Sequence, residues 1–435
     1  MSSVTPYNIA VSDEKLQQLH QKLENASFPD ELDASGWDMG VPLQDIKRLV
    51  GVWREKYDWR AQEAKLNEQL TQFTVRIEVD GFGELDIHTV HHRSGHSKAV
   101  PLLFIHGWPG SFLESTKLIP LLTKNDGDGP AFDVVAPSLP NFGFSQGVKK
   151  VYQFPSMNAV KYILTIKPER ATKNTARLIC LYESEPANPQ AVIQGGDWGS
   201  MIARTMSQFY PQHTQAIHLN FIPVVPPYPW RSPFQFFKSV LSVPFSAKDR
   251  AFIARTVGYI THGNAYMKQQ ETRPQTLGYG LHDSPVGLLA WIYDKMHTWT
   301  DKYPWTDEEI LTWVSVYYFS TAGPMASTRI YHEASAPKRD DNEAKGDLKY
   351  MALDKVLAVT APHNVRFAVA QFREEIIQWP MPWYRAIGNV VQETEFDRGG
   401  HFAAWEVPEL LAADLKKFLG NKGPAYGAVT DRDGY

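Results

Sequence analysis

The chain has 435 residues, of which 43% are hydrophobic, and its formal net charge is −4 at pH 7. This length fits one large domain with insertions or two domains, and the charge gives no basic field that would gather nucleic acid or anionic lipid. The single cysteine, Cys180, excludes an intrachain disulfide and a multi-thiolate metal site, and no apolar run approaches the roughly 18 residues of a membrane span, so we expect a soluble, cytoplasmic protein without a membrane anchor.

Residues 1–95 are expected to form an arm of helices that ends in a hairpin. Ser12 can cap a first helix, and apolar residues recur at helical spacing from Leu43 to Tyr57. Residues 73–92 then alternate between apolar and polar on both sides of Asp80-Gly81, which is a hairpin signal. Such an arm is too thin to bury its own apolar faces, so we expect it to pack on the chain that follows.

The next part, residues 96–221, is expected to begin the core. Its short apolar runs "PLLFIHGWPG", "FDVVAPSLP" and "AVIQGGDWG" are separated by glycine-rich turns and helices. This alternation is typical of a mostly parallel sheet that helices cover on both faces. The core is expected to finish in residues 346–435, with strands in "NVRFAVA" and "GNVVQE" and a last helix that ends near Gly420.

Residues 222–345 interrupt this rhythm with helical signals and no convincing strand. Ser284-Pro285 matches a helix N-cap followed by proline, and Thr306 to Glu309 matches a capping box. The segment is rich in aromatic residues. We interpret it as a helical lid inserted over the sheet of an α/β core.

The stretch "AVIQGGDWGSMIARTMSQFY" predicts a strand, a sharp turn and a helix, with Asp197 at the tip of the turn. An α/β-hydrolase places its nucleophile on such an elbow, whose flanking residues must be small because the backbone passes close to its neighbours. Gly195, Gly196, Gly199 and Ser200 meet that demand. A carboxylate nucleophile is already ionised near pH 7 and needs no base to activate it. The alternative is a glycine-rich turn whose aspartate only caps the next helix.

A second stretch, "GFSQG" at 143–147, also satisfies the pattern G-x-S-x-G and would make Ser145 the nucleophile of a serine esterase. Its context argues against this role. Pro140 and Asn141 separate it from the preceding strand, and "VKKVYQFP" is a poor start for a buried helix.

The segment "HGWPG" directly follows the strand "LLFI". In this architecture the turn after that strand supplies one backbone N–H to an oxyanion hole, and the residue after the nucleophile supplies the other. The two amides are therefore expected to be those of Trp108 and Trp198. An ordinary exit from a strand into a loop is the alternative.

His401 lies between the last strand and the last helix, where the order nucleophile, acid, histidine places the general base. Its orienting acid should come from the loop after "NVRFAVA", which offers both Glu374 and Glu375. Asp397 is expected to be a solvated loop residue, because it stands only four positions before His401.

Taken together, these segments resemble an epoxide hydrolase of the microsomal and fungal type over nearly the whole chain. The resemblance rests on "GWDMG" and "WREKYDWRAQEAKLN" in the arm, "HGWPGSFLE" and "QGGDWGS" in the core, "NAYMKQQETRPQTLGYGLHDSPVGLLAWI" in the lid, and "RGGHFAAWEVPEL" near the end. It implies an epoxide and water as substrates, a vicinal diol as product, and no cofactor or metal.

Residue by residue, the resemblance implies that Asp197 is the nucleophile, His401 activates water and Glu375 is the acid. It also implies that Tyr266 in "NAYMKQQ" and Tyr331 in "RIYHEA" open the ring. From the residues alone, Tyr317 and Tyr318 are equal competitors for that role. The stretch at 149–190 is longer than the family pattern by about fifteen residues, which makes it a surface insertion or a sequence artefact such as an unspliced segment.

Other functions are open at this stage. A haloalkane dehalogenase uses the same aspartate and histidine but needs no pair of proton-donating tyrosines, and a degenerate hydrolase scaffold could act only in binding. "HHRSGH" at 91–96 lacks the spacing of a helical zinc motif and is expected to be a solvated turn. The aromatic lid favours a small apolar or aromatic epoxide, and the arm suggests a homodimer in which it wraps a partner subunit.

Overall fold

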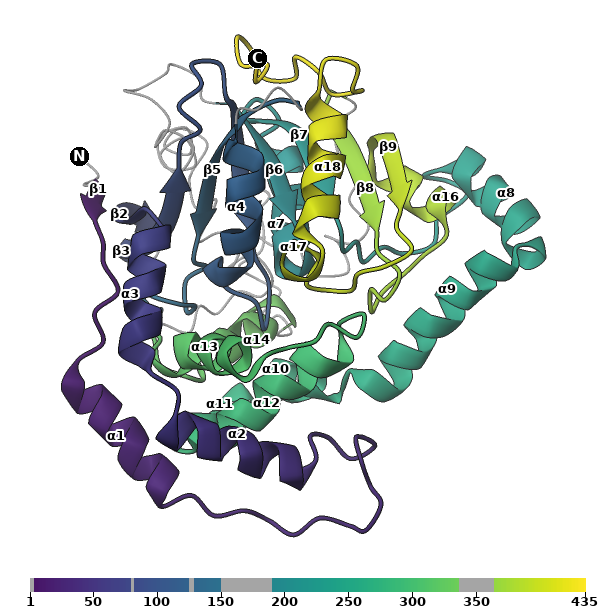
Figure 1. The fold of residues 1–435 in the computed structure, drawn as a ribbon. Helices are drawn as coiled ribbons and strands as arrows, with labels where there is room; N and C mark the ends of the chain where they lie inside the picture. Colours follow the sequence, from purple (N-terminus) through teal and green to yellow (C-terminus); the bar gives the residue numbers. More distant parts are fainter. Residues whose placement is uncertain (1–3, 80–81, 125–128, 150–189, 336–363) are drawn as a thin grey trace, which may run out of the picture.

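A computed structural model describes residues 4–79, 82–124, 129–149, 190–335 and 364–435. These residues fold around one sheet with the strand order β1-β2-β3-β5-β4-β6-β7-β8-β9 (Figure 1). The strands are β1 (Val4–Pro6), β2 (Gln72–Val79), β3 (Gly83–His92), β4 (Val100–Ile105), β5 (Phe132–Pro137), β6 (Ala191–Gly195), β7 (Thr214–Leu219), β8 (Arg366–Gln371) and β9 (Asn389–Glu395). The pairs from β1 to β5 are antiparallel, and those from β5 through β4 to β9 are parallel. The predicted α/β class with a mostly parallel sheet is confirmed.

The burial of the strands follows their place in the sheet. β4 and β5 are buried along their whole length, because helices cover both faces of the central sheet. β2 instead alternates between buried and exposed residues from Val75 to Val79, so one face of the hairpin meets solvent. The hairpin register ends with Val79 opposite Gly83, and the predicted turn residues 80–81 lie outside the described residues.

Several elements go beyond the sequence expectation, among them β1, β7 and α3. β7 (Thr214–Leu219) was not predicted, because its sequence TQAIHL mixes polar side chains into a short run. The arm has a third helix, α3 (Trp59–Gln69), which carries few apolar residues and buries Trp59, Glu63 and Leu66. β7 and α3 are both positioned by contacts with distant parts of the chain, and a local pattern of apolar and polar residues does not reveal such contacts.

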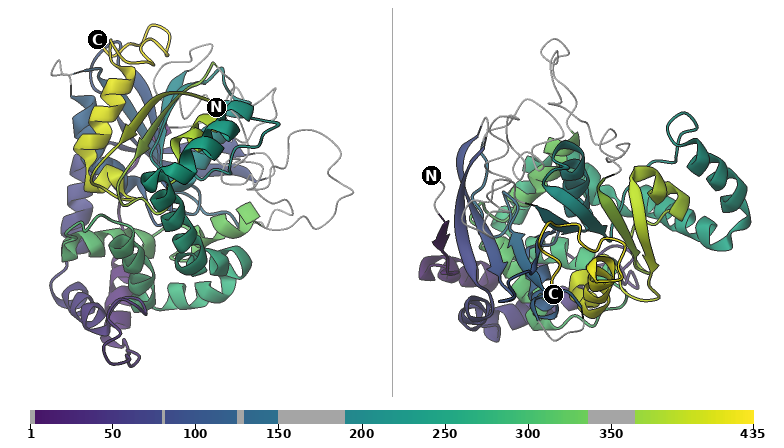
Figure 2. Two further views of the ribbon diagram at one scale, coloured as in Figure 1. Left: turned by 90° about the vertical axis from the view of Figure 1, so that its right-hand side faces the viewer. Right: turned by 90° about the horizontal axis from the view of Figure 1, so that it is seen from above.

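Helices cover the two faces of the central sheet (Figures 1 and 2). α4 (Ser115–Thr123), the short α17 (Ala403–Glu406) and α18 (Pro408–Leu419) lie on one face, and α7 (Asp197–Phe209) lies on the other. The parallel strands all end at the edge of the sheet that faces the lid helices, so the loops after β4, β6, β8 and β9 meet there. The remaining short helices are η1 (Phe112–Glu114), α16 (Met381–Tyr384) and η6 (Arg385–Ile387).

The lid occupies the chain between β7 and β8. Its helices are α8 (Pro233–Ser242), η3 (Val243–Phe245), α9 (Ala247–Gly258), the π-helix η4 (Tyr259–Gly263), α10 (Ala265–Thr272), α11 (Pro274–Asp283), α12 (Pro285–Thr298), α13 (Asp307–Tyr318), η5 (Ala326–Thr328) and α14 (Arg329–Ser335). Both predicted helix starts are confirmed. The Ser284 hydroxyl accepts from the Gly287 amide, and Thr306 and Glu309 form a capping box.

The N-terminal arm packs against the lid of its own chain, as Figure 1 shows for α1 (Asp13–Glu24) and α2 (Leu43–Glu55) beneath the lid helices. The Tyr57 hydroxyl donates to Thr312 Oγ1 over 3.1 Å. The Trp37 ring stacks on His297 with 3.6 Å between ring centroids, and Arg48 forms an ion pair with Asp307. The expectation that the arm packs on the following chain is confirmed.

The expected solvated turn at 91–96 is wrong for its first two residues. His91 and His92 are the last residues of β3, where they pair with Val135 and Val134 of β5. Burial lowers the pKa of His91 to about 4. Burial in β3 is continuous from Ile87 to His91, so the strand runs further than the polarity of these histidines suggests.

Within the extra stretch at 149–190, residues 150–189, which include Cys180, lie outside the described residues. None of the described helices combines the length and the apolar character needed to cross a bilayer. Within the same described ranges, no three His, Cys, Asp or Glu side chains gather as the ligands of a metal ion would.

Candidate active site

Asp197 stands at the junction of β6 and α7, with a backbone φ of +46°. This left-handed conformation costs a non-glycine residue on the order of 1–3 kcal/mol and persists only where the surrounding structure enforces it. The neighbours are glycines because the turn has no room for more. A Cβ at Gly199 would lie 1.9 Å from the carbonyl oxygen of Ile105 in β4, and one at Gly107 would lie 2.3 Å from Asp197 itself.

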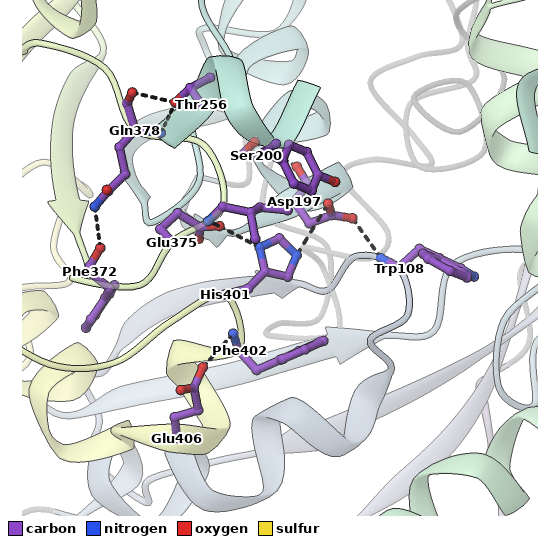
Figure 3. A network of polar contacts seen from close by, with 12 residues as sticks. Trp108, Asp197, Ser200, Thr256, Phe372, Glu375, Gln378, His401, Phe402 and Glu406 are labelled. Atoms are coloured by element: carbon purple, nitrogen blue, oxygen red, sulfur yellow. Dashed lines mark hydrogen bonds and ion pairs between the residues drawn. The ribbon is translucent and has the colours of Figure 1, made fainter. Parts of the chain in front are cut away.

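The Asp197 carboxylate is directed toward the loop after β4 and away from its own helix (Figure 3). Its Oδ1 accepts a hydrogen bond of 2.7 Å from the backbone amide of Trp108. Its backbone carbonyl accepts from the Ser200 hydroxyl over 2.7 Å, which braces the first turn of α7. The second predicted amide, that of Trp198, is the next one along this first turn.

His401 lies in the connection between β9 and α17 and faces Asp197 (Figure 3). Its Nε2 lies 3.5 Å from Oδ2 of Asp197, and its Nδ1 lies 2.7 Å from Oε1 of Glu375. The backbone amide of His401 donates to the Trp299 carbonyl over 2.9 Å, which ties the histidine loop to the lid. The structure therefore brings Asp197, His401 and Glu375 together in one line of contacts.

The side chains of the two neighbouring glutamates point to different partners. Glu375 is 1% exposed and points to His401, whereas Glu374 forms an ion pair with Arg255 at the surface of the lid. The loop that carries them is closed by Gln378, whose amide nitrogen Nε2 donates to the Phe372 carbonyl over 2.8 Å and whose backbone amide donates to Thr256 Oγ1 over 2.8 Å (Figure 3). The Ile376 amide also donates to Glu375 Oε1, which helps to keep the carboxylate pointing toward His401.

The charge state of His401 follows from this setting. Burial alone would lower the pKa of the imidazole, but the carboxylates of Glu375 and Asp197 outweigh it and hold the pKa of His401 well above its usual value. The Asp197 carboxylate is thus one of two charges that favour the protonated form of the ring. When Asp197 loses its negative charge, for example as an ester, one of the two charges that raise the pKa of His401 disappears. The pKa of the imidazole then falls.

Tyr266 on α10 and Tyr331 on α14 both lie beside the Trp108 loop. Their ring centroids are 5.9 Å apart, and each ring contacts that of Trp108, Tyr266 in a stack at 5.2 Å and Tyr331 edge-on at 5.7 Å. Tyr331 also meets the Trp198 ring edge-on at 5.0 Å. The structure thus brings both tyrosines to the rings of Trp108 and Trp198, the two residues whose amides were predicted to flank Asp197.

The two competing lid tyrosines are engaged elsewhere. The Tyr317 hydroxyl donates to the carbonyl of Gly110 over 2.6 Å, and the Tyr318 ring packs against Trp53 of the arm. Asp397 is exposed, as the sequence predicts.

Ser145 is not available as a nucleophile. It is fully buried, its hydroxyl donates to the Ser138 carbonyl over 2.7 Å, and its oxygen accepts from the His88 amide over 2.9 Å. These contacts make it a structural residue between β3 and the loop after β5, and the serine esterase alternative loses its nucleophile.

Two residues of the site escaped the sequence interpretation. Glu114, in the short helix η1, lines a small cavity with Asp197, His401 and Gly107, and burial raises its pKa to about 8. Tyr259, in η4, has its hydroxyl 2.8 Å from that of Tyr266. The sequence signal for Glu114 is weak, since the residue only follows the apolar pair Phe112-Leu113. Tyr259 has no signal, because a helical tyrosine in an aromatic-rich lid resembles its neighbours.

Comparison with known proteins agrees with this geometry. The family model described as "Epoxide hydrolase N terminus" matches residues 4–115, and the model "alpha/beta hydrolase fold" matches residues 100–408. "Epoxide hydrolase 1" of Sus scrofa is 32% identical, and the alignment covers 96% of this chain and 89% of that protein.

Two solved structures are similar over almost the whole chain. The epoxide hydrolase of Aspergillus niger superposes with a TM-score of 0.76 at 29% identity and covers 96% of both chains. The juvenile hormone epoxide hydrolase of the silkworm Bombyx mori superposes with a TM-score of 0.78 at 26% identity, covering 95% of this chain and 93% of its own.

Proposed function

The chain belongs to the epoxide hydrolases of the α/β-hydrolase fold, and from that premise we propose that it opens its epoxide through a covalent ester of Asp197 and hydrolyses the ester with water activated by His401. The observation that carries the proposal is the pair of contacts on one carboxylate. Oδ1 of Asp197 accepts from the Trp108 amide, while Oδ2 faces His401 at 3.5 Å.

In the first step Oδ2 of Asp197 attacks a ring carbon from the side opposite the oxirane oxygen. A carbon–oxygen bond forms, the ring bond breaks with its electron pair on the oxygen, and a tyrosine proton moves to that oxygen. Tyr266 and Tyr331 are the two proposed ring-opening groups. Their positions beside the Trp108 ring support this assignment.

In the second step His401, oriented by Glu375, takes a proton from water, and the hydroxide adds to the ester carbonyl carbon of Asp197. The amides of Trp108 and Trp198 are proposed to stabilise the oxyanion, an effect worth about 2.7–4 kcal/mol per donor. Collapse expels the diol alkoxide, which takes the proton from His401. The proton left on Asp197 returns to the tyrosine phenolate, so the site regains its starting state.

The test uses styrene oxide and a small panel of aliphatic epoxides with an assay for diol. Asp197→Ala should abolish turnover, and His401→Gln should accumulate an ester that adds the mass of the substrate to the intact protein. Asp397→Asn, at an exposed position four residues before His401, is the matched control and should keep full activity. Turnover by a folded Asp197→Ala variant would refute the covalent scheme.

The substrate is proposed to be a small apolar or aromatic epoxide, because the rings of Trp108, Trp198, Trp299 and the two tyrosines surround the nucleophile. A haloalkane dehalogenase is the competing activity, and release of halide from a bromoalkane would favour it. The tyrosine pair supports the epoxide, since a halide leaves without a proton.

We also propose that the chain is divided into an arm (1–95), a core in two parts (96–221 and 346–435) and a lid (222–345). A homodimer is a separate proposal, which analytical ultracentrifugation tests. The arm's contacts with its own lid favour a different role for it than wrapping a partner subunit.

A further inference from the structure

The two ring-opening tyrosines differ in what surrounds their hydroxyl groups. The Tyr266 hydroxyl lies 2.8 Å from that of Tyr259, at the start of η4. The Tyr331 hydroxyl is buried and makes no hydrogen bond within the described part of the chain. The Tyr266 hydroxyl is therefore hydrogen-bonded to a second phenol, whereas the Tyr331 hydroxyl makes no such bond within the described residues.

The ring of Tyr266 also has a cation beside it. Lys295 on α12 places its Nζ 5.0 Å from the centroid of the Tyr266 ring and 5.9 Å from that of Trp299. The lysine side chain is only 14% exposed and forms an ion pair with Asp294. An ammonium group at this distance attracts the electrons of an aromatic ring, and the attraction grows when the group is desolvated.

Tyr331 has only aromatic neighbours of this kind. Its ring meets those of Trp198, Trp108 and Tyr266 edge-on, with interplanar angles of 84°, 89° and 84°. These contacts fix the direction of its hydroxyl, and the Trp198 and Tyr266 side chains oppose the rise in its pKa. Among the described residues, however, no lysine or arginine lies over its ring as Lys295 lies over that of Tyr266.

The difference matters because a tyrosine that protonates the oxirane oxygen becomes a phenolate. Burial raises the pKa of both tyrosines well above the usual value, and the Asp197 carboxylate raises it further. A buried phenolate forms readily only where donors or cations face it. Of the two, Tyr266 has a second hydroxyl at its oxygen and a cation at its ring.

We propose that Tyr266 is the proton donor of ring opening, that Tyr259 and Lys295 are its positioning residues, and that Tyr331 holds the ring oxygen by a hydrogen bond and keeps its proton. This inference rests on the proposed function of Asp197 and refines it. Tyr259 donates its hydrogen to Tyr266 Oη, which leaves the Tyr266 hydrogen free to point at the oxirane.

Ring opening moves one proton, from Tyr266 to the oxirane oxygen. Attack by Asp197 breaks the ring bond, the electron pair goes to the oxygen, and the Tyr266 hydrogen follows it. Tyr266 is then a phenolate that accepts from Tyr259 and lies next to Lys295. At the same moment Asp197 becomes an uncharged ester, so the anion that opposed ionisation of Tyr266 is gone. Tyr259 keeps its own hydrogen throughout.

The experiment is a double-mutant cycle in the His401→Gln chain, where ester formation is read directly as the mass increase of the protein in a single turnover. Tyr259→Phe keeps the ring and removes the hydroxyl. It should slow ester formation about tenfold, the usual loss when a donor to a developing charge is removed. The same substitution should slow the Tyr331→Phe chain by the same factor and should have no further effect on the Tyr266→Phe chain.

Two other variants complete the design. Lys295→Met should reproduce this pattern with a smaller loss, and it serves as the second test should Tyr259→Phe unfold the lid. Tyr303→Phe is the matched control, because that lid hydroxyl is bonded to Glu309 and Lys117 and has no contact with Tyr266. Circular dichroism confirms that each variant is folded.

The outcomes separate cleanly. A Tyr259→Phe effect that vanishes in the Tyr266→Phe chain supports the inference. An effect that persists there, or that vanishes in the Tyr331→Phe chain, overturns it, as does an unchanged or faster ester formation by Tyr259→Phe and Lys295→Met. If His401→Gln alone accumulates no ester, it is the proposed function that fails.

Discussion

Oε1 of Glu375 lies 2.7 Å from Nδ1 of His401, while the adjacent Glu374 pairs with Arg255 at the lid surface. Glu375→Gln should slow hydrolysis of the ester by about 10²-fold or more, because the imidazole loses the anion that orients it and holds its proton. Ester formation should remain close to normal, so the ester accumulates. Rapid-quench mass spectrometry measures both steps.

Glu374→Gln is the control for that substitution. It removes a half-exposed ion pair, whose loss costs about 0–1 kcal/mol, and should leave both steps unchanged. A large loss of hydrolysis in Glu374→Gln and none in Glu375→Gln would exchange the roles of the two acids.

Gly199→Ala should disrupt the elbow, because a Cβ there would lie 1.9 Å from the backbone oxygen of Ile105 in the next strand. The oxygen belongs to a buried strand and cannot move aside, so we expect a loss of stability of roughly 3 kcal/mol or more together with loss of activity. Thermal unfolding measures the first effect. Gly51→Ala, in the open part of α2 with no atom within 4 Å, should be neutral or slightly stabilising. Equal melting temperatures for the two variants would contradict the close approach.

Ser145→Ala should keep its turnover and lose stability. The Ser145 oxygen satisfies the His88 amide and its hydroxyl donates to the Ser138 carbonyl, so its removal leaves a buried donor unpaired at a cost of about 1–3 kcal/mol. Urea unfolding and the diol assay check the two expectations. A folded variant without activity would revive Ser145 as a catalytic group.

Glu114→Gln should change how stability depends on pH. Burial raises the pKa of Glu114 from 4.5 to about 8, so below about pH 4.5 both the folded and the unfolded chain carry the proton. Between pH 4.5 and 8 only the unfolded chain gives it up, and the wild type loses stability as the pH rises. One pKa unit is worth about 1.4 kcal/mol, so the variant should gain up to a few kcal/mol on the wild type between pH 5 and 8. Urea unfolding at the two pH values measures this gain, and a gap that does not change with pH would show that Glu114 is not protonated in the fold.

Trp53→Ala should release the arm from the lid. Trp53 on α2 is 4% exposed and its ring meets that of Tyr318 on α13, so its truncation should cost about 3–5 kcal/mol. Limited proteolysis should then cut residues 1–70 before the core. Met39→Ala, at a position that is 71% exposed, is the control and should protect the arm as the wild type does. Equal proteolysis of the two variants would mean that the arm is held by other contacts.

Much of the fold and of the nucleophile turn could be predicted from the sequence because the signals are local. A turn as tight as that at Asp197 requires glycines within a few residues, and helix caps such as that at Ser284 lie next to the helices they begin. β7 and α3 could not be predicted, since their few apolar residues become informative only against the strands and helices that they contact.

The choice among chemically equal side chains is not local. Glu374 and Glu375 follow the same strand, and the turn closed by Gln378 decides which one points inward. The four lid tyrosines that compete for ring opening are likewise distinguished by how the lid helices sit on the loop after β4, where Tyr317 bonds to Gly110 and Tyr266 stacks on Trp108. For both choices the resemblance to a family supplied what the residues alone did not.

β7 and β8 are direct neighbours in the sheet, although the whole lid lies between them in the chain. The lid thus leaves and re-enters the core at adjacent points. Replacing it with the lid of a relative therefore need not move the strands that lead to Asp197 and Glu375. The arm contacts the lid, so it belongs to the same transplantable unit. A chimera that takes both together should inherit the substrate range of the donor, whereas one that takes the lid alone leaves mismatched surfaces at Trp37 and Tyr57.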